Sequence, residues 1–340
     1  MTKDYNKMNN LEKLINKKIL ITGGAGFIGS NLCEFFIKNN SKIICLDNFS
    51  TGYKENITHL MSNKNFRLIE GDIRDLATCL HASKDVDYVL HHAALGSVPR
   101  SIKEPLVTND VNITGFLNML IASRDNSVKR FVYAASSSTY GDSIEIPKVE
   151  NVIGNPLSPY AITKYVNELY ANNFKTLYKL DCVGLRYFNV FGRRQDPKGA
   201  YAAVIPKFIS SLIHKTSPVI NGDGSYSRDF TYIDNVIQIN LLAITTSNKD
   251  ALNNVYNVAC EEKTTLNELF LKLRNNLSEY DKDINYVNCN FGPNRLGDIP
   301  HSMASVKKAK DLLKYNPEYN IDKGLKKYLK WIMNNPNNEL

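Results

Sequence analysis

The sequence predicts an α/β fold in which a doubly wound parallel sheet is followed by a smaller C-terminal α/β lobe. Short apolar runs alternate with helical patterns as far as about residue 188, as in a parallel sheet covered by helices on both faces. A glycine-rich loop joins the first apolar run to the first helical pattern. Beyond about residue 189 glycine, proline and aspartate become frequent, which indicates a less regular lobe.

Seven short apolar runs are predicted to be strands, because buried parallel strands are short and continuously apolar. They cover residues 18–22, 42–47, 66–70, 87–91, 130–135, 181–187 and 254–259. Apolar residues at helical spacing predict helices over residues 29–38, 111–123, 160–180, 265–277 and 304–314.

The composition is that of a folded, basic protein. The chain has 340 residues, of which 43% are hydrophobic, enough for one large domain or a domain with a smaller lobe. Charged residues make up 22% and form no long block, which argues against disorder. The net charge is +8, but the lysines are scattered, so we expect no nucleic-acid partner. An anionic small-molecule ligand would also suit this charge.

Cysteine usage and hydropathy point to the cytoplasm. The six cysteines form no C-x-x-C pair, which favours free thiols in a reducing compartment over disulfides or a metal site. His91 and His92 are adjacent and would point to opposite faces of a strand, which is poor metal geometry. Residues 1–16 are polar, unlike a signal peptide, and no apolar run is long enough to span a membrane.

The glycine loop predicts a dinucleotide site of the Rossmann type. Gly23, Gly26 and Gly29 bridge the first strand and the first helix, with Phe27 and Ile28 at the start of that helix. Glycine lets the backbone approach a pyrophosphate, whose charge the helix N-terminus stabilises. The spacing is G-x-x-G-x-x-G rather than G-x-G-x-x-G. The alternative is a glycine-rich turn without a ligand, which the strand-to-helix placement disfavours.

Asp47 selects NAD over NADP in this prediction. It ends the second strand, where a carboxylate can accept hydrogen bonds from ribose hydroxyls and would repel an extra phosphate. No arginine occurs in the following residues 48–52. A plain turn aspartate is the alternative.

Three further strand ends are candidates for cofactor contacts. Asp72 and Ile73 follow the third strand, where adenine could lie, although Asp72 could equally be a helix N-cap. The small residues Ala93 and Ala94 follow the fourth strand and would let the backbone pass close to the cofactor. Asn109 is a candidate for structuring that loop.

Tyr160 and Lys164 are the candidate proton-transfer pair. Four residues apart at the start of a predicted helix, they face the same side. An ammonium beside a phenol is expected to lower the pKa of Tyr160 from about 10 toward neutral. Ser136 or a neighbour, at the end of the fifth strand, adds a hydroxyl, and such a trio can take a proton from an alcohol while hydride leaves its carbon. In the alternative, Tyr160 only packs behind Pro159 and Lys164 is solvated.

On these features the chain resembles the extended short-chain dehydrogenases/reductases, and more narrowly the nucleotide-sugar 4-epimerases. The resemblance runs from about Lys17 to about Lys330 and is most specific over residues 93–101, 134–141 and 184–195. These segments are similar to bacterial 4-epimerases of UDP-N-acetylglucosamine and UDP-N-acetylgalactosamine, which supply surface polysaccharides such as O-antigen. A close group acts on UDP-N-acetylglucosaminuronic acid. The resemblance implies a cytoplasmic homodimer, paired through the helices containing residues 111–123 and 160–180.

The resemblance also implies a role for each site residue. Catalysis falls on Ser136, which stands four residues before Tyr140, together with Tyr160 and Lys164. NAD contacts fall on Gly23, Gly26, Phe27, Ile28, Gly29, Asp47, Asn48, Ser50, Thr51, Gly52, Asp72, Ile73, Ala93, Ala94, Asn109, Tyr160, Lys164 and Tyr187. UDP-sugar contacts fall on Gly96, Ser97, Arg100, Ser137, Ser138, Asn189, Ala203, Val204, Asn221, Arg228, Arg295, Asp298 and Ser302. Without the resemblance, each arginine would be a surface ion pair.

The domains implied are an NAD-binding part, residues 17–188 plus about 229–260, and a UDP-sugar lobe, about 189–228 plus 261–335. In the implied reaction Tyr160 takes the proton of the sugar 4-hydroxyl and hydride passes to NAD. The 4-keto sugar then turns over and hydride returns to its other face. A small residue at Ser302 leaves room for an N-acetyl group, where a tyrosine marks enzymes restricted to unacetylated hexoses.

Two departures and three rival functions accompany this hypothesis. Pro300 replaces a usually basic residue, which leaves a neutral sugar and a C6-oxidised sugar open, and His92 stands where relatives usually have glutamine. A 4,6-dehydratase would need an acid after the serine, and Ser137-Ser138-Thr139 offers none. A non-catalytic NAD-binding scaffold is the remote alternative. Such proteins often lose the tyrosine or the lysine, whereas Tyr160 and Lys164 are both present.

Overall fold

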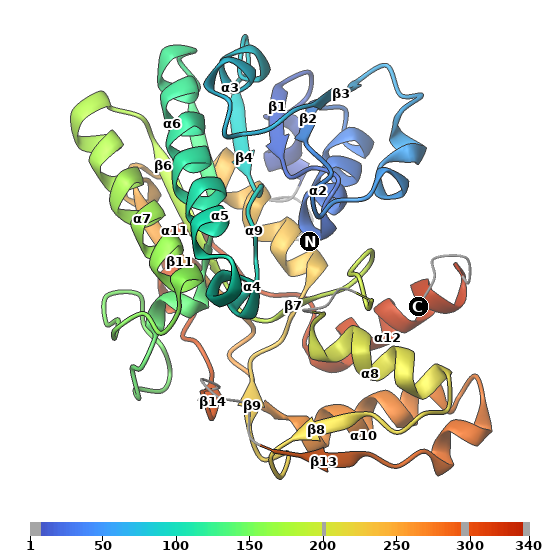
Figure 1. The fold of residues 1–340 in the computed structure, drawn as a ribbon. Helices are drawn as coiled ribbons and strands as arrows, with labels where there is room; N and C mark the ends of the chain where they lie inside the picture. The colour runs from blue at the N-terminus through green and yellow to red at the C-terminus, as the bar shows by residue number, and fades with distance from the viewer. Residues whose placement is uncertain (1–7, 199–201, 294–298, 336–340) are drawn as a thin grey trace.

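A computed structural model of the chain describes residues 8–198, 202–293 and 299–335. A seven-stranded parallel sheet forms its centre, with the order β11-β6-β5-β4-β1-β2-β3 (Figure 1). Its strands confirm the predicted α/β class. They are β1 (Lys18–Thr22), β2 (Lys42–Asp47), β3 (Phe66–Glu70), β4 (Tyr88–His91), β5 (Arg130–Ser136), β6 (Cys182–Tyr187) and β11 (Asn254–Val258).

Helices cover both faces of the sheet, and two apolar cores lie beneath them. Alternation along β1 sends Ile19 and Ile21 into one core and Leu20 into the other. The first core lies under α2 (Phe27–Lys38) and α9 (Ile233–Thr245). The second lies under α3 (Leu76–Ala82), α6 (Gly115–Asp125) and α7 (Pro159–Tyr178).

The connections across the sheet include short helical segments. These are a helix over residues 8–12, α4 (Val98–Lys103), α5 (Pro105–Asn109), a π-helical stretch (Asp110–Thr114) that runs into α6, and 3₁₀ turns at Lys54–Asn56, Thr58–Leu60, Ser137–Tyr140, Lys249–Ala251 and Lys282–Tyr286. The long helix α7 begins at Pro159 because Ser158 caps it, accepting the N–H of Ala161 at 3.1 Å.

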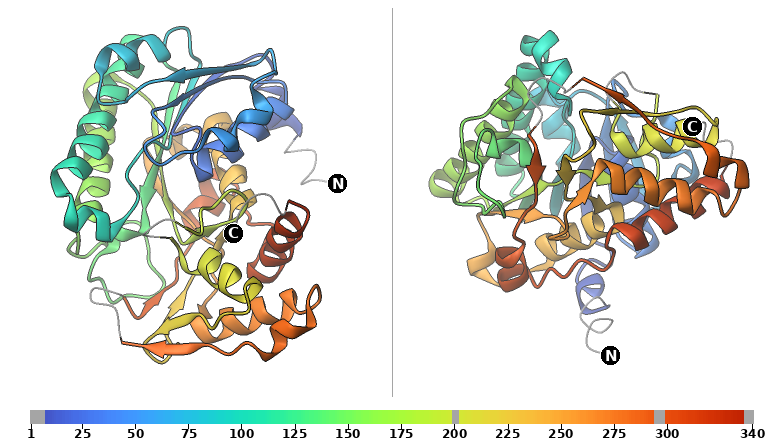
Figure 2. Two further views of the ribbon diagram at one scale, coloured as in Figure 1. Left: turned by 45° about the vertical axis from the view of Figure 1, so that its right-hand side comes forward. Right: turned by 90° about the horizontal axis from the view of Figure 1, so that it is seen from below.

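A second lobe lies beyond the carboxyl ends of the strands, at the bottom of Figure 1. It is built from small pieces far apart in sequence, as both views of Figure 2 show. Its elements are β7 (Val190–Phe191), α8 (Val204–Ile213), β8 (Val219–Asn221), β9 (Ser227–Arg228), β10 (Thr231–Tyr232), β12 (Thr264–Thr265), α10 (Leu266–Leu277), β13 (Asn290–Gly292), β14 (His301–Ser302) and α12 (Ile321–Met333).

The chain crosses between the two parts more than once. After β10 it returns to the sheet as α9 and β11, and α11 (Lys307–Leu313) also packs against β11 and α9. The division into 17–188 plus 229–260 and 189–228 plus 261–335 stays a prediction. Among the described residues, no helix is both long enough and apolar enough to cross a bilayer.

Candidate functional site

A cavity of about 590 Å³ opens at the carboxyl ends of the strands and collects most of the predicted site residues. From the predicted cofactor set it is lined by Gly23, Gly26, Phe27, Ile28, Gly29, Asp47, Asn48, Ser50, Thr51, Gly52, Asp72, Ile73, Ala93, Ala94 and Tyr187. The trio Ser136, Tyr160 and Lys164 lies in the same lining, as do Gly96, Ser97, Arg100, Ser137, Asn189 and Ala203. Residues from 23 to 203 therefore meet at one place.

Other predicted residues stand apart from this lining. They are Asn109, Ser138, Val204, Asn221, Arg228 and Ser302. Arg295 and Asp298 lie outside the described residues.

The glycine loop packs too closely for side chains. A Cβ on Gly29 would stand 2.1 Å from the Gly23 oxygen, and a Cβ on Gly23, whose φ is +66°, would stand 2.7 Å from the Ala93 nitrogen. The loop ends at Gly26, the N-cap of α2, so the first N–H groups of this helix lie beside the cavity. Such a cradle with a positive helix end suits a pyrophosphate.

Asp47 both holds the loop and faces the cavity. Its Oδ2 accepts the N–H of Ala25 at 2.9 Å, and its Oδ1 accepts the N–H of Phe49 at 2.8 Å. Burial raises the pKa of Asp47, against the lowering effect of these backbone bonds. Because each carboxylate oxygen has a second lone pair, Asp47 can still accept a hydroxyl from a ligand.

Asp72 is not a helix N-cap, which was the alternative for this residue. Asp75 caps α3 instead, accepting the N–H groups of Ala77 and Thr78. Asp72 accepts Nη2 of Arg74 at 2.7 Å and Nδ2 of Asn48 at 2.8 Å, and bonds from Arg74 lower its pKa to about 2. Asp72 therefore ties together two strand-end loops that line the cavity.

Asn112, rather than Asn109, structures the loop after β4. Its Oδ1 accepts the N–H of Leu95 at 2.8 Å, and its Nδ2 donates to the Leu95 oxygen and to Oγ1 of Thr163. Asn112 is buried, whereas Asn109 is exposed at the end of α5. The prediction for Asn109 was wrong because the fold buries the asparagine three residues further on, in the π-helical stretch.

The proton-transfer trio lies at the junction of β5 and α7, where Ser136 and Lys164 are buried and Tyr160 is half-buried. Ser136 is the last residue of β5, and its Oγ accepts the N–H and the hydroxyl of Ser138 at 3.1 and 2.9 Å. Lys164 Nζ donates to the Ala134 oxygen at 2.8 Å and lies 6.0 Å from the centroid of the Tyr160 ring. Ser138 is therefore a hydrogen-bond partner of Ser136 and does not itself line the cavity.

The expected lowering of the pKa of Tyr160 by Lys164 is not what this site shows. Burial raises the pKa of Tyr160, and the neighbouring Ser136 hydroxyl lowers it in part. Burial also lowers the pKa of Lys164 to about 8. A desolvated phenolate is costly, so the environment of the whole pocket outweighs the spacing of two residues along a helix.

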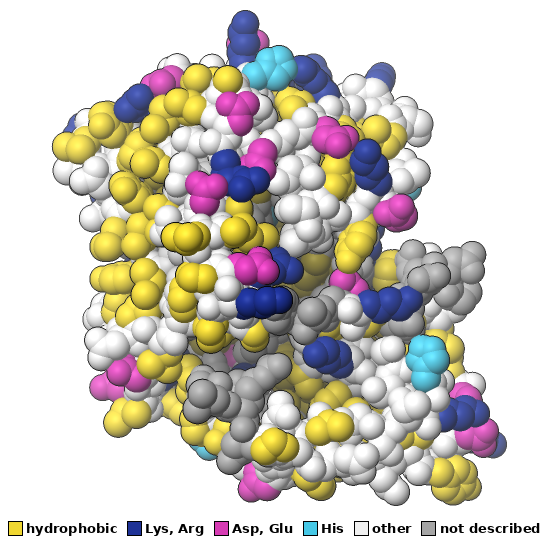
Figure 3. All heavy atoms as spheres, viewed as in Figure 1, with side chains coloured by type: hydrophobic (Ala, Val, Ile, Leu, Met, Phe, Trp, Pro, Cys, Tyr) yellow, Lys and Arg dark blue, Asp and Glu magenta, His cyan; other side chains and the backbone are white. Residues whose placement is uncertain are grey.

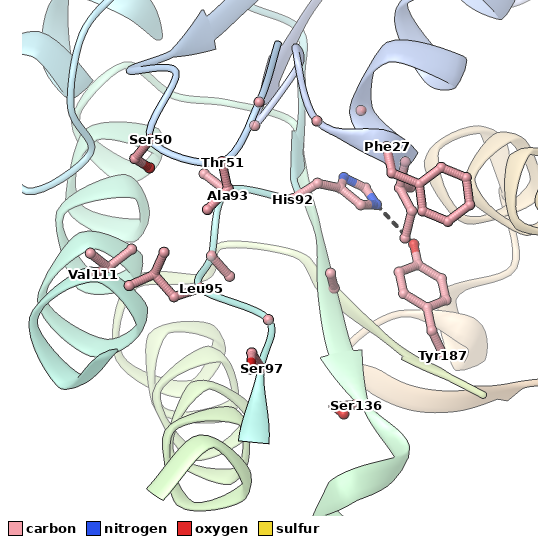
Figure 4. A pocket seen from close by; sticks show the side chains of 18 of the residues that line it. Phe27, Ser50, Thr51, His92, Ala93, Leu95, Ser97, Val111, Ser136 and Tyr187 are labelled. Atoms are coloured by element: carbon pink, nitrogen blue, oxygen red, sulfur yellow. Dashed lines mark hydrogen bonds between the residues drawn. The ribbon is translucent and has the colours of Figure 1, made fainter. Parts of the chain in front are cut away.

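His92 was noted in the sequence only as a departure, yet it lines the cavity. Its Nε2 lies 2.9 Å from Oη of Tyr187, as the dashed line in Figure 4 marks. Gln195 and Asp196 also belong to the lining and had been given no role. Asp196 accepts the Tyr53 hydroxyl at 2.8 Å. These residues are 143 positions apart, so no local sequence pattern could have predicted their contact.

Three of the predicted UDP-sugar contacts, Asn221, Arg228 and Ser302, lie on short paired strands of the lobe. Ser302 of β14 is paired with Arg228 of β9, and Asn221 ends β8. Nη1 of Arg228 donates to the Ser227 and Pro300 oxygens. Asp229, next to Arg228, accepts the N–H of Cys260 at 2.9 Å and that of Ala304 at 3.3 Å, joining the end of the sheet to the lobe.

A second, larger cavity, of about 1010 Å³, lies between α2, α9 and α12. It contains none of the predicted site residues and is lined instead by residues such as Phe35, Leu241 and Trp331. Within the described ranges, no group of three His, Cys, Asp or Glu side chains is placed to hold a metal ion.

Comparison with known proteins identifies the family. Residues 19–259 match the family described as "NAD dependent epimerase/dehydratase family". A UDP-glucose 4-epimerase of Mycolicibacterium smegmatis is 31% identical over 93% of this chain and 99% of its own. A UDP-N-acetylglucosamine 4-epimerase of Methanobrevibacter ruminantium, solved with UDP-N-acetylmuramic acid, is 39% identical, with a TM-score of 0.87 over 94% of this chain and 99% of that one.

A further relative has been solved with its cofactor. The UDP-glucuronic acid 4-epimerase of Bacillus cereus, in complex with UDP-glucuronic acid and NAD, is 30% identical, with a TM-score of 0.83 over 93% of this chain and 99% of that one. The cofactor of the present chain is NAD. The glycine cradle, the N-terminus of α2 and Asp47 fit this group.

Proposed function

The chain belongs to the NAD dependent epimerase/dehydratase family, within its UDP-sugar 4-epimerases, and from that premise we propose that it interconverts UDP-N-acetylglucosamine and UDP-N-acetylgalactosamine. The observation that carries the proposal is that Ser136, Tyr160 and Lys164 line the same cavity as the glycine loop. The relative crystallised with a UDP-linked N-acetyl sugar adds support. The product would serve surface polysaccharide synthesis.

Proton transfer at the sugar 4-oxygen is the task of Tyr160. NAD, when bound, accepts the C4 hydride and returns it. The phenol oxygen of Tyr160 takes the 4-hydroxyl proton and gives it back to the 4-keto sugar, with the Ser136 hydroxyl beside it. It is the phenolate that takes this proton and the resulting phenol that returns it; because burial raises the pKa of Tyr160, the phenolate depends on its neighbours, of which the Ser136 hydroxyl lowers the pKa. Lys164, with a pKa of about 8, keeps a positive charge nearby.

Room for an N-acetyl group supports the choice of sugar. Gly96 lines the cavity, and no atom stands within 4 Å of the position that a Cβ would take there. Ser97 and Ala203, two other small residues, also belong to the lining. The space around Gly96 contrasts with the glycine loop, where a Cβ on Gly29 would collide with the backbone.

The acids of the cavity argue against a 4,6-dehydratase. Moving the C5 and C6 protons would need a carboxyl group next to the proton-transfer trio. The carboxylates in the described lining are Asp47, Asp72 and Asp196, of which the first two end β2 and follow β3. None follows Ser136, where the sequence continues with Ser137, Ser138 and Thr139.

A homodimer is part of the proposal. Side chains on α4, α5 and α7 leave large apolar groups in solvent: Ile102 at 64%, Leu106 at 84%, Ile162 at 50%, Leu169 at 53% and Leu177 at 60% exposure. Figure 3 shows apolar side chains gathered over these helices, on its left side. A face of this kind commonly pairs with a second copy.

The test is proton NMR of the purified protein with UDP-N-acetylglucosamine, its C6-oxidised uronate or UDP-glucose. We expect a new C4-epimer signal with the first substrate. Turnover of the uronate alone would assign the chain to the oxidised sugar, and of UDP-glucose alone would contradict the argument from Gly96. No inversion with any of the three would remove the proposed function.

The matched variant is Tyr160→Phe. Loss of the phenol proton is expected to lower turnover by about 10²- to 10⁴-fold while the purified protein keeps its NAD. Full activity of this variant would exclude the mechanism even if the reaction itself is observed.

A further inference from the structure

His92, Tyr187 and Asn240 form a hydrogen-bonded chain along one wall of the cavity. His92 follows β4, Tyr187 ends β6 and Asn240 belongs to α9. Nε2 of His92 lies 2.9 Å from Oη of Tyr187, and Nδ2 of Asn240 lies 2.9 Å from the same oxygen. The His92 and Tyr187 rings are stacked, with centroids 5.9 Å apart and planes inclined by 19° (Figure 4). Both residues line the cavity, whereas Asn240 is buried behind them.

The direction of each of these hydrogen bonds can be worked out from the Asn240 side chain. Nδ2 of Asn240 also donates to the Val236 oxygen at 2.8 Å, and a carbonyl can only accept. The atom facing Val236 and Tyr187 is therefore the amide nitrogen, and it donates to both. Oη of Tyr187 accepts from Asn240, and Nε2 of His92 is the other polar atom of the described residues within hydrogen-bond distance of it, so we assign the single Tyr187 proton to that bond.

In this assignment His92 is a neutral acceptor. If Nε2 accepts the Tyr187 proton, the ring proton sits on Nδ1, which is buried without a hydrogen-bond partner in the described part of the chain, and an imidazolium would have no lone pair to offer. The surroundings agree, because burial, together with the charge of Lys164, lowers the pKa of His92 to about 3. The wall therefore carries no charge opposite Lys164 at neutral pH.

We propose that His92 is a positioning residue for the cofactor: as acceptor of the Tyr187 hydroxyl, it holds the Tyr187 side chain in place and leaves this wall of the cavity uncharged. With Asn240 on one side and His92 on the other, a swing of the Tyr187 side chain about its Cα–Cβ bond would break two hydrogen bonds. A fixed, neutral wall suits NAD, whose oxidised ring is itself positively charged. The proposal concerns the cofactor and does not depend on which sugar is turned over.

Four variants separate the hydrogen bond from mere packing. His92→Leu removes the acceptor, Tyr187→Phe removes the donor, and His92→Gln retains an acceptor in its amide oxygen. We expect the two single losses to weaken NAD binding by about three- to tenfold each, the cost of one hydrogen bond. The double variant His92→Leu/Tyr187→Phe should be no weaker than either single variant, and His92→Gln should stay within about twofold of the parent.

The measurement is NAD affinity by calorimetry on protein stripped of cofactor, with the melting temperature as a check on folding. Unchanged affinity in His92→Leu would overturn the proposal. Equal loss in His92→Gln and His92→Leu would also overturn it, because ring packing rather than the acceptor would then matter.

A second measurement determines the protonation of the His92 ring in the parent protein itself, so it does not depend on a variant with weakened NAD binding. The parent protein is labelled with ¹⁵N-histidine, and the His92 signals among its six histidines are assigned by their absence in His92→Gln. We expect a neutral ring with its proton on Nδ1, unchanged from pH 5 to pH 8. A ring with its proton on Nε2, or a titration within this range, would contradict the assigned bond directions.

Discussion

The two ends of the main cavity differ in how tightly they are built. At the cofactor end, a Cβ on Gly29 would stand 2.1 Å from backbone and Asp47 is held by two backbone N–H groups. At the end near Gly96, a Cβ on that residue would meet nothing within 4 Å, and the predicted sugar contacts Arg228 and Ser302, outside the cavity lining, sit on strands of two residues. In the proposed reaction the cofactor stays bound in one fixed shape, whereas the sugar turns over between two faces.

The largest effect on NAD affinity is expected from Gly29→Ala, which adds a side chain at the tightly packed cofactor end. Its Cβ collides with the Gly23 backbone, and overpacking of this kind typically costs about 1–3 kcal/mol, so NAD affinity should fall by about 100-fold and the melting temperature should drop. The control is Gly96→Ala, which should keep both. Calorimetry with NAD measures the difference, and equal losses in the two variants would erase the contrast between the ends.

Ser302→Tyr tests the sugar contacts predicted in the lobe. An added ring beside Arg228 should lower turnover of the N-acetyl sugar by about 5- to 150-fold, while NAD content and turnover of UDP-glucose are kept. Coupled assays with both sugars check this, with Ser302→Ala as the control. A parallel loss on both sugars would show that Ser302 does not decide which sugar fits.

Asp229 joins the end of the sheet to the lobe, and replacing it should change how stability depends on pH. Burial raises the pKa of Asp229 to about 7, so the folded protein holds this proton at pH values where the unfolded chain has lost it. The free energy of unfolding of the parent, relative to Asp229→Asn, should therefore fall as pH rises from about 4 to about 7 and level off above. Urea unfolding at several pH values measures it, and a difference that stays flat would refute the assignment.

The smallest effect on catalysis is expected at the apolar helical face, away from both ends. Leu106→Glu would bury a charge in the proposed dimer and should weaken self-association by about 100-fold with little change in the activity of each subunit. Ile144→Glu is the control, because Ile144 is 92% exposed on a loop outside these helices. Light scattering after size exclusion reports the mass, and dissociation by both variants or by neither would argue against this interface.

The strands of the sheet could be predicted closely from the sequence. Residues 42–47 and 66–70 were expected and observed without change, and residues 130–135 gained only Ser136. Each is a continuous apolar run bounded by turn residues, so its signal is local. The short strands of the lobe escaped prediction because β9 and β14 are two residues long and pair across 74 positions, as in Ser227 and His301.

By itself the sequence determined the parallel sheet, the glycine loop with Asp47, and the order of Ser136, Tyr160 and Lys164, because each depends on neighbours within a few residues. Only the tertiary structure decided which asparagine holds the loop after β4, in which direction the pKa of Tyr160 moves, and that His92 meets Tyr187. These depend on burial and on contacts between distant strands. Desolvation and packing are properties of the surroundings in space, and spacing along the chain does not contain them.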